Sequence, residues 1–150
     1  ELAGHELSHL WWSGNQIVPD DREGAAMLTE TLAMYTEMML YKKMYGIEKM
    51  KERIKMHQQI YDAEKGFSEN EPLYKVKDGS THISYSKGAV VMVELANIIG
   101  ENVNKALRGF LRKNAYPSKM PVTTDLIKEF LNVSQAIYHE RIKKMFMHTE

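Results

Sequence analysis

The sequence predicts an all-α fold, arranged as an irregular helical array. Most segments repeat apolar residues at the three- and four-residue spacing of a helix, and we find no convincing strand pattern and no internal repeat. A chain of 150 residues with 43% hydrophobic residues has material for one core. We therefore expect a single domain over residues 1–150.

Gly and Pro residues mark the ends of several expected helices. The helical segments cover residues 1–13, 25–45, 47–64, 84–99, 102–114, 123–132 and the stretch from 134 onward. Residues 25–45 contain no Gly or Pro and are apolar on most sides, so this helix is expected to be largely buried. Ser84 or Ser86 is the expected N-cap of the fourth helix. The polar connection before it is expected to hold a short extended piece at 73–77.

Charge and composition exclude several classes of partner. Twenty basic and twenty acidic side chains cancel without forming a long block of either sign, so nucleic acid is not an expected partner. The absence of any run of about eighteen apolar residues predicts a soluble segment.

The chain lacks cysteine, so a bound metal must use His, Asp or Glu, and the cellular compartment stays open. Because the chain opens at Glu1 inside a helical pattern, we expect further upstream parts.

The first helix carries the sequence "HELSH", with histidines at positions 5 and 9. Side chains four residues apart project from one face of a helix, so His5 and His9 can share one metal ion. Glu6, beside the first histidine, is placed to take a proton from a water molecule on that ion. The alternative is an ordinary helix with two surface or hydrogen-bonded histidines.

A catalytic zinc ion needs a third protein ligand, and Glu30 is the candidate. It lies inside the second helix among apolar neighbours, where a bare carboxylate is costly unless it is paired or bound to metal. An ion pair with a lysine or arginine, or a solvent-facing rotamer, is the alternative. The extended histidine motif of metzincins is excluded, because Trp12 and Asn15 occupy the positions of its Gly and His.

A peptide hydrolase also needs a donor for the oxyanion of its transition state. Tyr85, in "ISYSKGAVV", stands at the start of the expected fourth helix, where the helix dipole favours negative charge nearby. Gly88 would let another backbone or a substrate approach closely. A tyrosine at a helix start is more often a packing residue than a catalytic one, so position alone does not identify it.

Taken together, "HELSHLWW", "LTETLAMYTEMMLYKKMYG" and "ISYSKGAVVMVELANIIG" resemble the aminopeptidase N family of gluzincin zinc peptidases. The resemblance implies that the chain is the helical C-terminal part of a thermolysin-like catalytic domain, acting on peptides. Carried over by position, it implies one zinc ion per chain held by His5, His9 and Glu30. It further implies Glu6 as the general base that activates the zinc-bound water, and Tyr85 as the oxyanion donor.

The chain departs from the family pattern in three respects. Twenty residues separate His9 from Glu30 instead of about eighteen, which a longer loop accommodates at little cost. The usual Asn-Glu-Gly around the ligand is Thr29-Glu30-Thr31. The upstream Gly-x-Met-Glu-Asn segment, which binds the free amino group of a substrate in that family, is absent. Aminopeptidase action is therefore implied by the resemblance alone, and substrate-binding residues are unknown.

The stretches "TETLAMYTEMMLYKKMYG" and "YPSKMPVTTDLIKEFL" are also similar to a bacterial branch in which such a domain is joined to membrane permease segments. This similarity implies an upstream catalytic subdomain, permease segments and a membrane-associated parent protein. It also supports an alternative function, a zinc-binding sensor or interaction domain without catalysis, attached to a transporter. Whether the segment is active alone, and its oligomeric state, stay open.

Overall fold

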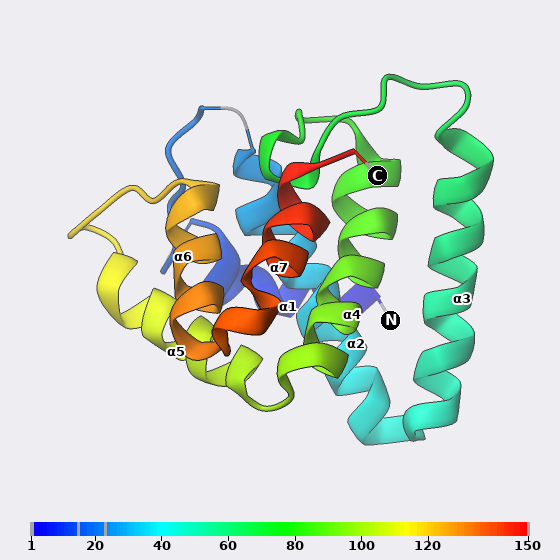
Figure 1. Ribbon diagram of the computed structural model, residues 1–150, viewed down its shortest axis with the longest axis horizontal. Helices are drawn as coiled ribbons and strands as arrows, with labels where there is room; N and C mark the ends of the chain where they lie inside the picture. The colour runs from blue at the N-terminus through cyan, green and yellow to red at the C-terminus, as the bar shows by residue number, and fades with distance from the viewer. Residues whose placement is uncertain (1, 15, 23, 150) are drawn as a thin grey trace.

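The computed structural model describes residues 2–14, 16–22 and 24–149, and within them the chain is all-α, as predicted. No strand forms in this part of the chain. Its α-helices are α1 (Leu2–Trp12), α2 (Leu32–Tyr45), α3 (Ile47–Glu64), α4 (Gly88–Ile99), α5 (Asn102–Asn114), α6 (Thr123–Val133) and α7 (His139–Met147). α3 forms one outer edge of the molecule, and α7 lies between α4 and α6 (Figure 1).

Two π-helical segments interrupt the regular helical geometry. The first, η1 (Met27–Thr31), leads directly into α2, and the second, η3 (His82–Lys87), leads directly into α4. A π-helical turn widens the hydrogen-bond ladder and is frequent at functional sites. Here each π-helical segment carries one predicted site residue, Glu30 in η1 and Tyr85 in η3.

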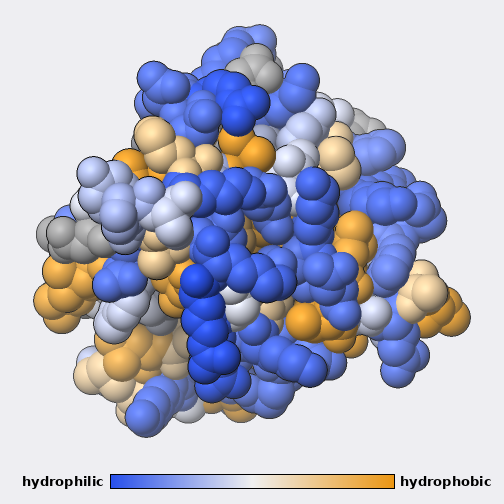
Figure 2. Space-filling view, turned by 90° about the vertical axis from the view of Figure 1, so that its left-hand side faces the viewer, coloured by the Kyte–Doolittle hydropathy of each residue, from blue (hydrophilic) through white to orange (hydrophobic). Residues whose placement is uncertain are grey.

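One hydrophobic core joins the helices. Its fully buried members include Met27, Leu32, Met92, Phe110 and Phe130, contributed by η1, α2, α4, α5 and α6. On the face drawn in Figure 2, hydrophobic side chains show between hydrophilic ones and do not cover the surface. In the described part of the chain, no helix combines the length and the apolar character that crossing a membrane requires.

Two local expectations are wrong. The extended piece at 73–77 is instead a short 3-10 helix, η2 (Leu73–Lys75), because Pro72 is extended and the Lys75 N–H bonds back to its carbonyl. The fourth helical segment begins at His82, so Ser84 and Ser86 are not its N-cap. Both serines are buried inside the first turns of this segment, and the Ser84 hydroxyl donates to the carbonyl of Ser80.

Candidate metal centre

The two histidines of α1 lie one helical turn apart on the same face, as their spacing predicts. His5 is buried and His9 is partly buried, and their Nε2 atoms are 3.2 Å apart. The Ser8 hydroxyl donates a 2.6 Å hydrogen bond to the carbonyl of His5, so this buried hydroxyl has a partner within the helix. α1 therefore presents two imidazole nitrogens at one point.

Glu30 reaches the same point from η1. Its Oε2 atom lies 3.1 Å from His5 Nε2 and 3.6 Å from His9 Nε2. Ligands held at zinc–ligand distances of about 2.0–2.2 Å in a tetrahedron are roughly 3.3 Å from one another. The separations among the three donor atoms match that spacing, and two imidazoles with one carboxylate form a donor set that suits zinc.

The environment of Glu30 differs from the expected alternatives. Among the described residues its ion pairs are with His5 and His9, not with lysine or arginine. Its side chain is 26% exposed, so one side of the carboxylate faces solvent while the other faces the imidazoles.

The charges of His5 and Glu30 are coupled. Hydrogen bonding to the Glu30 carboxylate raises the pKa of His5 above its usual value, although burial works in the opposite direction. The same hydrogen bond lowers the pKa of Glu30, which burial would otherwise raise. The Glu30 carboxylate is thus held in its anionic form, which is the form that binds a cation.

Tyr85 lies against this cluster. Its ring stacks on that of His5, with ring centroids 5.2 Å apart and an angle of 21° between the planes. Burial raises the pKa of Tyr85 above its ordinary value, and the nearby Glu30 carboxylate raises it further. The phenol therefore keeps its proton at neutral pH and is available as a hydrogen-bond donor.

Glu6 lies on the exposed surface of α1 beside His5. Its negative charge contributes to the raised pKa values of both His5 and Tyr85. His5, His9, Glu30 and Tyr85 therefore lie around one location, and Glu6 follows His5 on α1.

A comparison with models of protein families identifies the family of this chain. The model of the Peptidase family M1 domain matches residues 1–149. The chain belongs to peptidase family M1. This confirms the resemblance to aminopeptidase N-like gluzincins, and M1 peptidases are zinc-dependent enzymes that act on peptides. Comparison with curated proteins and with solved structures gave no match.

In this M1 chain, sequence reasoning missed a further acidic residue at the cluster, Glu37. Glu37 of α2 is buried, and its Oε2 atom lies 4.0 Å from His5 Nδ1. Arg53 of α3 donates a 2.6 Å hydrogen bond to the other oxygen, Oε1. A signal was available, because Glu37 follows Glu30 by seven residues, which is two helical turns on the same face.

Four aromatic side chains outside the cluster differ in their burial. Trp12 belongs to the core, whereas Trp11 is 47% exposed. His57 is buried, with its Nδ1 atom 3.4 Å from the Ser86 hydroxyl. His82 is also buried, and its ring stacks on that of Tyr61.

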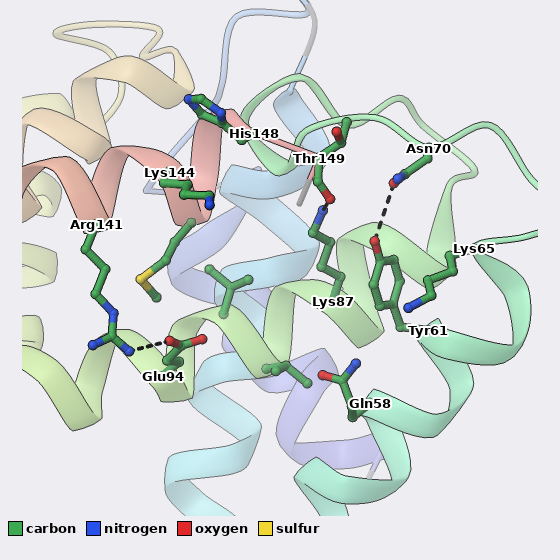
Figure 3. Close-up of a pocket in the computed structure, with 13 residues that line it drawn as sticks. Gln58, Tyr61, Lys65, Asn70, Lys87, Glu94, Arg141, Lys144, His148 and Thr149 are labelled. Atoms are coloured by element: carbon green, nitrogen blue, oxygen red, sulfur yellow. Dashed lines mark hydrogen bonds and ion pairs between the residues drawn. The ribbon is translucent and has the colours of Figure 1, made fainter.

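A separate cavity of about 500 Å³ lies between α3, α4 and α7, and it contains none of the predicted site residues (Figure 3). Lys87 points into it, with its amino group bonded to the Thr149 carbonyl and 5.3 Å from the centre of the Tyr61 ring. Arg141 and Glu94 form an ion pair at its edge. The cavity and the histidine cluster therefore share no residue.

Proposed function

We propose that this protein is a zinc peptidase of the aminopeptidase type, in which His5, His9 and Glu30 hold one Zn²⁺. The observation that carries the proposal is the convergence of the three donor atoms, which all lie within 4.8 Å of one another. Three protein ligands leave one position for water or substrate, the arrangement of a catalytic zinc site. Membership of the M1 family supports the same assignment.

A zinc ion at this position supplies Lewis acidity, which polarises a substrate carbonyl and makes water a better nucleophile. Glu6, exposed beside His5, accepts the proton of the attacking water and passes it to the leaving amine. Tyr85 keeps its proton and donates a hydrogen bond to the developing oxyanion. His9 and Glu30 are partly exposed, so the cluster is open to a substrate on one side.

Aminopeptidase action is the finer part of the proposal. It is tested by comparing hydrolysis of aminoacyl anilides with that of the same compounds carrying an acetylated amino group. An aminopeptidase cleaves the free compounds at least about a hundredfold faster, since it recognises the amino group. Equal rates would instead support endopeptidase action.

The catalytically silent sensor makes a different prediction, namely zinc binding with no turnover of any peptide. The upstream catalytic subdomain and the permease segments stay predictions, because they concern parts of a protein outside these 150 residues. Zinc content and turnover, measured on the same preparation of the protein, separate the enzyme from the sensor.

A further inference from the structure

The two ring nitrogens of His5 face different carboxylates. Nε2 lies 3.1 Å from Glu30 Oε2, whereas Nδ1 lies 4.0 Å from Glu37 Oε2. Nδ1 is buried and makes no hydrogen bond to any described residue. A histidine that binds metal through Nε2 carries its proton on Nδ1, and that proton needs an acceptor.

Glu37 is held in place by α3. Its side chain is 6% exposed, and its Oε1 atom accepts the 2.6 Å hydrogen bond from Arg53. The Arg53 side chain is itself mostly buried, with its guanidinium carbon 5.4 Å from the centre of the Tyr41 ring. A buried carboxylate is costly without a cationic partner, so Arg53 allows Glu37 to remain charged at this position.

The two oxygens of Glu37 thus have different neighbours: Oε1 contacts Arg53 and Oε2 faces His5. An ion pair that served only to join α2 to α3 would not need its second oxygen to face a candidate metal ligand. A movement of about 1 Å brings Oε2 within hydrogen-bonding range of Nδ1.

We infer that Glu37 is a positioning residue: it accepts the Nδ1 proton of His5 and so presents the Nε2 lone pair to the metal, while Arg53 fixes the Glu37 carboxylate. The metal site then extends over three helices, from His5 on α1 through Glu37 on α2 to Arg53 on α3. The inference rests on the proposed function, because the tautomer of His5 matters in this way only if Nε2 binds a metal.

The test measures zinc affinity by competition with a chelator at fixed pH, for the wild-type protein, Glu37→Gln and Glu37→Asp. Glu37→Gln removes the charge while keeping the shape, and we expect zinc to bind about 10- to 100-fold more weakly. Glu37→Asp keeps a carboxylate for Arg53 but withdraws it from His5, and we expect about a tenfold loss. Glu94→Gln, which breaks the exposed ion pair with Arg141, is the matched control and should bind zinc like the wild type.

A second readout separates positioning from a structural role. In zinc-loaded protein labelled with ¹⁵N-histidine, the Nδ1–H proton of His5 should be observable in the wild type and should exchange faster with water in Glu37→Gln. If the Glu37–Arg53 pair had only a structural role, Glu37→Gln would lower the unfolding temperature of the metal-free protein and leave both zinc affinity and this signal unchanged.

The outcomes are distinguishable. Equal zinc affinity in the wild type and both Glu37 variants would overturn the inference and leave the three ligands in place. If Glu37→Gln does not fold, the zinc affinity and the His5 Nδ1–H signal of Glu37→Asp test the inference. A wild-type protein that binds no zinc would instead refute the proposed function itself.

Discussion

The Thr31 hydroxyl donates a 2.6 Å hydrogen bond to the main-chain carbonyl of Ser84, and both residues are buried. Thr31 follows the candidate ligand Glu30, and Ser84 precedes Tyr85. This bond therefore holds the two π-helical segments against each other at the positions that carry site residues. The segment that carries the candidate ligand Glu30 is thus linked to the segment that carries Tyr85, the proposed oxyanion donor, by a hydrogen bond inside the core.

Gly88 is the glycine that makes this contact possible. A β carbon at Gly88 would lie 2.5 Å from Thr31 Oγ1 and 2.7 Å from Thr31 Cγ2. The group that approaches Gly88 is thus the Thr31 side chain, not a substrate. We expect Gly88→Ala to lower the free energy of unfolding of the metal-free protein by about 1–3 kcal/mol, measured by urea denaturation.

The matched control for this prediction is Gly109→Ala in α5. A β carbon there meets only the end of the Glu129 side chain, at 3.2 Å, which can move aside. Alanine favours a helix over glycine by about 1 kcal/mol, so this variant should be neutral or more stable. Equal destabilisation by both substitutions would contradict the importance assigned to the Thr31 contact.

Glu6→Gln should abolish turnover and leave zinc in place. Glutamine cannot accept the proton of the attacking water, and general-base catalysis typically contributes about 10²–10⁴-fold. The measurement pairs hydrolysis of peptide anilides with metal analysis of the same sample. A variant with full zinc and unchanged turnover would require another residue as the base.

Tyr85→Phe should lower kcat by about 10²–10³-fold, because it removes one hydrogen-bond donor to the oxyanion. The ring that stacks on His5 is retained, so zinc affinity and stability should change little. Tyr116→Phe, at an exposed tyrosine, is the control. If kcat stays at the wild-type value in Tyr85→Phe, the tyrosine has only a packing role.

Asp125 gives the fold a pH dependence that does not involve the metal centre. Partial burial works to raise the pKa of Asp125, but the Val122 N–H and Lys119 outweigh it and hold this pKa below the usual value. The stabilisation is therefore present above about pH 4 and is lost as the pH falls through the lowered pKa. Asp125→Asn should cost about 1 kcal/mol of unfolding free energy at pH 7.

The check is urea denaturation of the wild type and Asp125→Asn at neutral and acidic pH. The difference between them should shrink as the wild-type carboxylate becomes protonated. A constant difference across this range would show that the charge of Asp125 does not stabilise the start of α6.

The helices themselves were predictable from sequence. α3 and α5 lie at their expected residues, because Gly46 and Gly100 interrupt amphipathic patterns that each bury one face. The pairing of His5 with His9 followed from the helical period alone, and Glu30 was found because a carboxylate among apolar neighbours requires a partner.

Other features depend on packing between distant segments. The π-helical segments are only 5 and 6 residues long, so their wider turn produces no repeat that the sequence pattern could show. The contact of Thr31 with Ser84 joins residues far apart in the chain. Adjacent tryptophans on a helix point about 100° apart, so only Trp12 could face the core. The spacing of Glu37 from Glu30 was a sequence signal, but the ion pair of Glu37 with Arg53 joins two helices and depends on their packing.

Zinc affinity of Glu30→Ala, compared with the wild type by chelator competition, tests the metal centre most directly. Asp21→Ala, at an exposed carboxylate in the preceding loop, is the control. We expect about one zinc per chain in the wild type and in Asp21→Ala, and affinity weaker by more than about tenfold in Glu30→Ala. Equal affinity in Glu30→Ala and the wild type would contradict the assignment of Glu30 as the third ligand.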